Sequence, residues 1–66
     1  MIEFAIGPKS KTQHNEIIKW LSLNSYVVKN ISNAGYHYSE IDVYGDFNKF
    51  SEKWKDTKGL SYENWE

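Results

Sequence analysis

Four polar residues at the start of the first predicted helix have the types and spacing to hold a phosphate. They are Lys9, Ser10, Lys11 and Thr12. At a helix N-terminus the first backbone N–H groups lack partners, and the helix dipole favours an anion. The glycine-to-GK[ST] spacing of a nucleotide-binding P-loop is absent. This segment is therefore either a site for a phosphate or nucleotide, or a helix cap flanked by solvated lysines.

Histidine and serine chemistry has little support from spacing. His14 and His37 are the two histidines of the chain, and their separation matches no H-x₃₋₅-H metal pattern. Glu40 follows His37 by three residues, which on a strand places the two side chains on opposite faces. No serine stands at a spacing that suggests a His/Asp arrangement. We expect no catalytic residues, no metal site, no cofactor and no enzymatic activity.

The charged residues argue against a nucleic acid as the partner. All eight basic residues are lysines, and the net charge is −1. Arginine, whose planar fork recognises phosphates and base edges, is absent. Four of the lysines lie on or just after the last predicted helix, but Glu52 and Asp56 lie among them. We interpret this stretch as a solvated helix face in which lysines pair with carboxylates at helical spacing.

Two helices are predicted from apolar side chains at helical spacing. The first extends over residues 11–23, where Ser10 and Gln13 have the spacing of a capping box. The second begins after Asp46, a favourable N-cap at the positive end of the helix dipole, and ends by Gly59. Each helix has an apolar stripe that needs a sheet to cover it.

Three strands are predicted. They are residues 2–6, where apolar side chains alternate, and the β-rich segments 25–31 and 36–44. The sequence of residues 32–35, Ser-Asn-Ala-Gly, is a turn signal that makes the last two strands a hairpin. The order β-α-β-β-α predicts an α+β domain in which a three-stranded sheet carries both helices on one face.

The register of this hairpin decides which of its side chains are buried. Pairing of Ile31 with Tyr36 leaves Lys29 on the uncovered face. Pairing of Ser32 with Tyr36 would place Lys29 among the buried aliphatic residues instead. We prefer the first register because an unpaired lysine in the core is costly.

The uncovered sheet face is the main candidate for contact with a partner. It would present tyrosines and carboxylates, and tyrosine is favoured in protein interfaces because it gives a large contact area at low entropic cost. With the aromatic C-terminal tail, residues 60–66, the predicted partner-binding residues are Tyr36, Tyr38, Glu40, Asp42, Tyr44, Tyr62 and Trp65. Alternatively, the tail folds over this face and completes the core, or it exchanges with a second copy.

Size and composition favour one small domain, residues 1–66, without disulfides. A chain of 66 residues buries only about 60% of its unfolded surface. With no cysteine and 17% aromatic residues, it needs efficient aromatic packing or self-association for stability. No apolar run is long enough to span a membrane and no signal peptide is recognisable, so we expect a cytoplasmic protein without a membrane partner.

These features together predict a binding protein. Abundant Lys, Asn, Ile and Tyr without Arg is the residue usage of AT-rich genes, which suggests a phage or mobile-element origin. The leading hypothesis is a small protein that inhibits or modulates a larger host protein in the host cytoplasm, such as a component of a defence system. Homodimerisation is a compatible variant. The alternative is a protein that binds or sequesters a small ligand, a nucleotide or phosphate.

Overall fold

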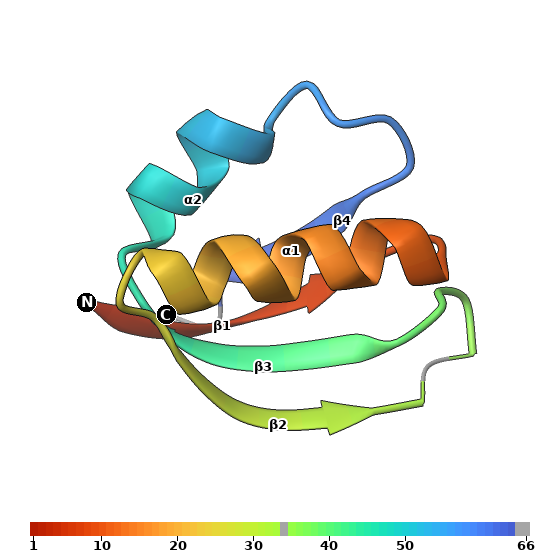
Figure 1. Ribbon diagram of the computed structural model, residues 1–66, viewed down its shortest axis with the longest axis horizontal. Helices are drawn as coiled ribbons and strands as arrows, with labels where there is room; N and C mark the ends of the chain where they lie inside the picture. The colour runs from red at the N-terminus through yellow and green to blue at the C-terminus, as the bar shows by residue number, and fades with distance from the viewer. Residues whose placement is uncertain (34, 65–66) are drawn as a thin grey trace.

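Two helices pack on one side of an antiparallel sheet in the computed structural model, which describes residues 1–33 and 35–64 (Figure 1). The described elements are β1 (Ile2–Gly7), α1 (Lys11–Leu23), β2 (Val27–Ser32), β3 (Glu40–Gly45), α2 (Phe47–Trp54) and β4 (Ser61–Asn64). The strands lie side by side in the order β2-β3-β1-β4. The prediction of an α+β fold with both helices on one face is thus confirmed, although the sheet has four strands among the described residues rather than three.

Helix α1 begins and ends where the sequence predicts. The Ser10 hydroxyl accepts a hydrogen bond from the Gln13 backbone N–H at 3.2 Å, and the Gln13 side-chain oxygen accepts one from the Lys9 N–H at 2.8 Å. These two bonds satisfy donors that a helix start leaves without partners. At the other end, Asn24 donates from its side chain to the Trp20 carbonyl, and Ser25 adopts a left-handed φ of 65° that turns the chain into β2.

The core lies between the sheet and the helices. Strand pairing places four apolar side chains on the helix side of β1 and β3. Together with residues from the helices and from the turn before β2, the buried set is Phe4, Ile6, Ile17, Leu21, Tyr26, Ile41, Val43 and Phe50. Full burial of one such side chain is worth about 1.5–3 kcal/mol, so this set accounts for the association of the two layers.

Tyr26 is fixed at the end of the core where β3 meets α2. Its hydroxyl donates a hydrogen bond to the Asp46 carbonyl, and its ring lies directly against the backbone of Gly45. Burial, together with the nearby Asp46 carboxylate, raises the pKa of Tyr26 to about 12. The ring and hydroxyl thereby join the start of α2 to the turn that follows α1.

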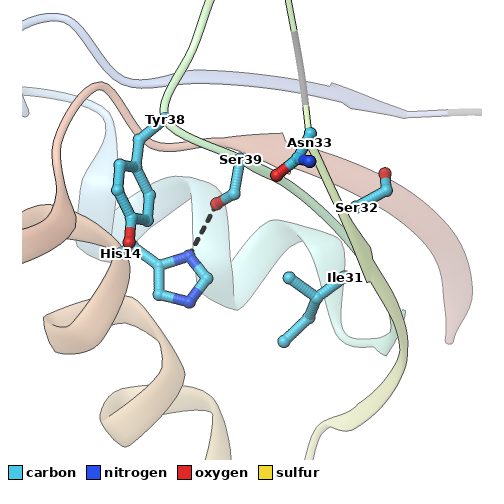
Figure 2. Close-up of a pocket in the computed structure, with 6 residues that line it drawn as sticks. All are labelled: His14, Ile31, Ser32, Asn33, Tyr38 and Ser39. Atoms are coloured by element: carbon cyan, nitrogen blue, oxygen red, sulfur yellow. Dashed lines mark hydrogen bonds between the residues drawn. The ribbon is translucent and has the colours of Figure 1, made fainter.

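The predicted hairpin between β2 and β3 was wrong in its turn and in its register. Strand β3 begins at Glu40 rather than at Tyr36, and Ile31 pairs with Ile41. The preceding segment is held by other partners. The Tyr38 N–H donates to the Pro8 carbonyl at 2.8 Å, and the Ser39 hydroxyl shares a hydrogen bond with His14 at 2.6 Å. Contacts with the start of α1 (Figure 2) therefore replace the expected ladder.

Lys29 lies outside the core as predicted, although β2 has an irregularity that the predicted pairing lacks. The register shifts by one residue between Val28 and Asn30, so Lys29 is an extra residue in the strand. Its ammonium lies 3.3 Å from a Glu3 carboxylate oxygen on the face away from the helices. Alternation with Val28 places Lys29 on this face, and the β-bulge brings Ile31 back to the helix side.

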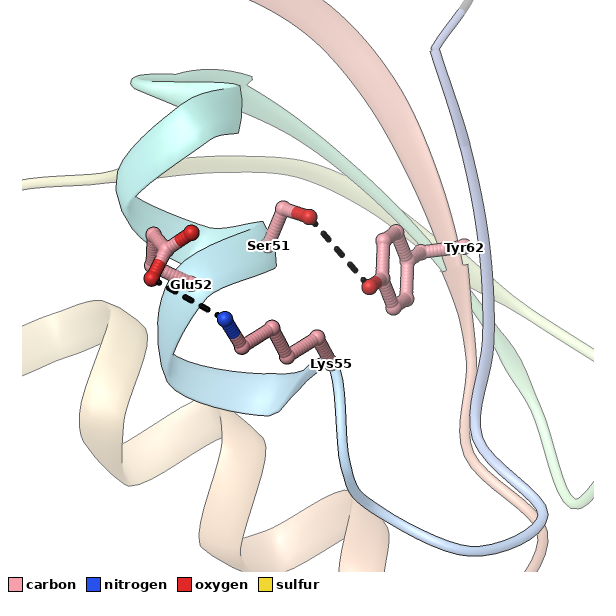
Figure 3. Close-up of polar contacts among 4 residues, drawn as sticks. All are labelled: Ser51, Glu52, Lys55 and Tyr62. Carbon is pink, nitrogen blue, oxygen red and sulfur yellow. Dashed lines mark hydrogen bonds and ion pairs between the residues drawn. The ribbon is translucent and has the colours of Figure 1, made fainter.

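The C-terminal tail, for which no strand was predicted, forms β4 over residues 61–64. Tyr62 pairs with Ile6 at the free edge of β1, and its ring turns to the helix side. Its hydroxyl shares a hydrogen bond with Ser51 of α2 at 3.3 Å (Figure 3). A bare edge of β1 is a set of unpaired backbone groups, and pairing with the tail satisfies them. The alternative in which the tail covers the uncovered face was therefore wrong for residues 61–64.

The exposed side of α2 follows the predicted pattern of a solvated face in part. Lys55 pairs with Glu52 at 3.3 Å (Figure 3), and both side chains are largely exposed. Lys53 instead lies over the ring of Trp54, with its ammonium 5.1 Å from the ring centre. Exposed pairs of this kind contribute little to stability, about 0–1 kcal/mol each.

Candidate functional site

Both helices lie on one side of the sheet, and neither covers the other side (Figure 1). Strand alternation and register place there every second residue of β1 and β3 and their cross-strand neighbours. The side chains it presents are Glu3, Ala5, Val27, Lys29, Asn30, Ser32, Glu40, Asp42, Tyr44, Ser61 and Glu63. We call this set the open face.

Carboxylates dominate the open face. Glu3, Glu40, Asp42 and Glu63 are set against one described cation, Lys29, whose ammonium is paired with Glu3. Clustered charge of one sign produces a local potential that attracts a surface of the opposite sign. The face therefore suits a positively charged partner, although the whole chain carries a net charge of only −1.

An apolar pair lies at one end of this acidic surface. Val27 and Tyr44 are cross-strand neighbours, and both are exposed. A tyrosine with an aliphatic neighbour is a common anchor in protein interfaces, since its ring gives apolar contact and its hydroxyl gives a hydrogen bond.

Asp42, in the middle of the face, offers a hydrogen-bond acceptor that is not used within the described chain. It lies in the ladder between Ala5 and Asn30, and its Oδ1 atom is buried without a hydrogen-bond partner among the described residues. A buried acceptor without a donor costs free energy that a donor from outside can recover. A bound partner could supply that donor.

The structure separates the predicted partner-binding residues. Glu40, Asp42 and Tyr44 lie on the open face as predicted. Tyr36 and Tyr38 are not part of the open face, because both precede β3, which begins at Glu40. Tyr36 is 97% exposed in the connecting segment, and the Tyr38 ring packs against His14.

Neither of the two predicted partner-binding residues of the tail, Tyr62 and Trp65, is placed on the open face by the described structure. Tyr62 lies on the helix side of the sheet, where its ring contacts Phe47 and Phe50. Trp65 lies outside the described residues. In contrast, sequence reasoning missed Glu3 and Glu63. Alternation with Phe4 on β1 was a sufficient signal for Glu3, whereas Glu63 required knowledge of β4.

A polar hollow of about 400 Å³ opens between the start of α1 and the segment that joins β2 to β3 (Figure 2). It is lined by His14, Ile31, Ser32, Asn33, Tyr38 and Ser39. The imidazole of His14 is held at Nδ1 by the Ser39 hydroxyl, 2.6 Å away, and the Tyr38 ring lies edge-on to it at 5.3 Å. Sequence reasoning missed this cluster because His14 and Ser39 are 25 residues apart.

The His14–Ser39 pair resembles the nucleophile and base of a hydrolase only in its distance. Ser39 is 4% exposed, which leaves little room for attack on a substrate. None of the lining residues is a carboxylate that could orient the imidazole. The rings, hydroxyls and amide around the hollow are instead suited to hydrogen bonding and stacking with a small polar ligand.

The predicted phosphate-binding residues belong in part to the helix cap. The Ser10 hydroxyl and the Lys9 N–H are bonded within it, and the Lys9 stem lies against Gly59. Lys11 and Thr12 are exposed in the first turn. The bond from Tyr38 to the Pro8 carbonyl places the polar hollow beside this segment.

Comparison with protein-family models, with curated proteins and with solved structures finds no match. Among the described residues, no group of three His, Asp or Glu side chains is arranged to hold a metal ion. Neither described helix has the length and apolar character needed to cross a membrane. The function must therefore be inferred from the geometry of the open face and the hollow.

Proposed function

We propose that this chain is a small binding protein whose open face docks on a positively charged surface of a larger protein and inhibits or modulates it. The observation that supports this most is a sheet face without helices over it, on which four carboxylates accompany the exposed Val27–Tyr44 pair. The unpartnered oxygen of Asp42 adds a position where a donor from the partner would be bound most strongly.

The mechanism is occlusion of the partner's surface. The carboxylates steer association with a basic patch and fix the orientation, while Tyr44 and Val27 provide the apolar anchor. Residue usage typical of AT-rich genes makes a phage or mobile-element inhibitor of a host defence protein the most economical form of this proposal. A cytoplasmic location follows from that form.

The proposal is tested by substituting Tyr44 with alanine and capturing partners from a bacterial lysate on the immobilised chain. We expect the wild-type chain to retain a specific basic protein and Tyr44→Ala to bind it at least tenfold more weakly, because truncated interface anchors cost about 2 kcal/mol or more. Tyr36→Ala is the matched control, since this tyrosine is exposed in the segment before β3 and belongs to no strand. Equal retention by Tyr44→Ala and the wild type, or no retained protein at all, would contradict the proposal.

A second candidate function, binding of a nucleotide, is favoured by the position of the hollow. His14 lies three residues after Lys11, on the same side of α1, so a base in the hollow would leave its phosphate within the range of the Lys11 ammonium. The amide of Asn33 matches the hydrogen-bonding edge of adenine, and Tyr38 offers a ring for stacking.

Thermal denaturation with millimolar AMP or adenosine distinguishes this candidate from the first. We expect AMP to raise the melting temperature by a few degrees and the Lys9→Ala/Lys11→Ala variant to lose this gain, because bound ligand stabilises the folded state. Lys19→Ala, an exposed lysine elsewhere on α1, is the control. An unchanged melting temperature across a panel of nucleotides would remove this candidate.

A further inference from the structure

Strand β2 is an edge of the sheet, and every one of its residues is exposed. Val27, Val28 and Ile31 are 56%, 37% and 49% exposed, although two of them point to the helix side. In Figure 1, β2 lies at the lower margin of the sheet and neither helix is drawn over it. A six-residue edge with apolar side chains on both faces is a template for pairing with another strand.

The usual protection of such an edge is weak in β2. A charged side chain and a bulge both commonly block edge pairing. Here the one charged side chain, Lys29, is drawn onto the open face by Glu3 and does not point out from the edge. The bulge remains, and its position has a geometrical consequence for which strand can pair there.

Because of the bulge, residues of β2 that are equally far from the midpoint of the strand lie on the same face of the sheet. Val28 and Ile31 both lie on the helix side, opposite Val43 and Ile41, while Val27 and Ser32 both lie on the open face. In a regular strand, residues three apart point to opposite faces. The extra residue at Lys29 removes that mismatch between Val28 and Ile31.

We propose that β2 pairs antiparallel with β2 of a second copy of this chain, about a two-fold axis between Lys29 and Asn30. Each cross-strand pair then has both members on one face. Val28 meets Ile31 on the helix side, and Lys29 meets Asn30 on the open face, so that no two like charges are directly opposed.

A second copy fits this edge because a two-fold interface requires a self-complementary surface, and the face symmetry of β2 supplies one. The pairing also covers the exposed side chains of Val28 and Ile31, which adds burial that so small a chain otherwise lacks. Both open faces end up on the same side of a continuous sheet and remain accessible. This inference is therefore independent of the proposed function.

Engineered cysteines test the register, because the wild-type chain contains no cysteine. Single variants Val28→Cys and Ile31→Cys are oxidised separately and as an equimolar mixture. We expect a cross-linked dimer mainly in the mixture, since Val28 faces Ile31 of the other copy and neither faces itself. A dimer that forms as readily from Val28→Cys alone, or no cross-linking in any sample, would overturn the proposed pairing.

Measurement of the molecular mass in solution tests whether the chain dimerises through the β2 edge. We expect the wild-type chain to be dimeric at about 100 μM and Ile31→Lys to dissociate at least tenfold more readily, while circular dichroism shows that the half-exposed position tolerates lysine. Leu23→Lys is the control, because Leu23 is 74% exposed on the side of α1 that faces α2. A monomeric wild type up to about 1 mM, or equal dissociation of the two lysine variants, would refute the proposal.

Discussion

Replacing Phe50 with alanine is expected to leave the chain largely unfolded at room temperature. Truncation of a buried phenylalanine costs about 3–5 kcal/mol, and small domains have a total stability near the lower end of about 5–15 kcal/mol. The ring is fully buried, with ring-centre distances of 5.4 Å to Phe4, 5.9 Å to Trp20 and 5.3 Å to Tyr62. Its loss therefore removes packing from β1, α1 and β4 at once.

Denaturant unfolding followed by near-ultraviolet circular dichroism measures this effect. Leu23→Ala is the control, because it removes an exposed aliphatic side chain and should change the free energy of unfolding by less than about 0.5 kcal/mol. If Phe50→Ala kept most of the wild-type stability, the aromatic cluster would not be the main source of stability. The buried aliphatic side chains, or pairing between copies through β2, would then contribute more of the stability.

The central role of Phe50 also explains which parts of the fold the sequence predicts. Both helices were predictable because their apolar residues recur at helical spacing and their N-caps, Ser10 and Asp46, carry recognisable side chains. The predicted end of α2 was wrong, because the helix stops at Trp54 rather than near Gly59. Strand β4 was not predictable from local pattern. It contains a single apolar residue, Tyr62, and becomes a strand because that ring completes the cluster around Phe50 and the backbone pairs with β1.

Before β3, a strand was predicted where the structure has none, since β3 begins at Glu40 and not at residue 36. The segment before it contains Tyr36 and Tyr38, which favour strands, but propensity for β-structure depends strongly on tertiary context. The bonds that tie Tyr38 to Pro8 and Ser39 to His14 connect segments that are far apart in the sequence. The local sequence pattern of residues 36–39 therefore could not predict these hydrogen bonds.

In the candidate site, too, local pattern predicts some features, whereas others depend on long-range contacts. Glu40, Asp42 and Tyr44 alternate with buried residues of β3, so their position on the open face could be predicted from a period of two. The acidic character of the face could not. It depends on the strand order, which places Glu3 of β1 and Glu63 of β4 beside β3 and is set by long-range pairing.

Gly45→Ala is the second substitution with a large expected effect, although it adds only a methyl group. A Cβ atom at this position would lie 2.3 Å from a ring carbon of Tyr26, well inside contact distance. The ring cannot move outward freely, because its hydroxyl is bonded to the Asp46 carbonyl. We expect a loss of about 2–4 kcal/mol in the free energy of unfolding, from about 1–3 kcal/mol of overpacking and about 1 kcal/mol for the hydrogen bond.

Gly35→Ala is the matched control for this substitution. No atom lies within 4 Å of a Cβ placed at Gly35, so an added methyl group meets no neighbour. This variant should be neutral or more stable by about 0.4–1 kcal/mol, since alanine restricts the unfolded chain. Denaturant unfolding of both variants gives the comparison.

Ionisation of Tyr26 identifies the cause of the loss. In the wild-type chain its pKa is raised to about 12, chiefly by burial. A ring displaced by the added methyl group would be more exposed, so absorbance titration of Gly45→Ala should show this tyrosine ionising closer to about pH 10, the ordinary value. A destabilised Gly45→Ala variant with an unchanged Tyr26 pKa would place the strain in the β3 backbone instead of the ring, and an unaffected stability would show that the core can yield at this corner.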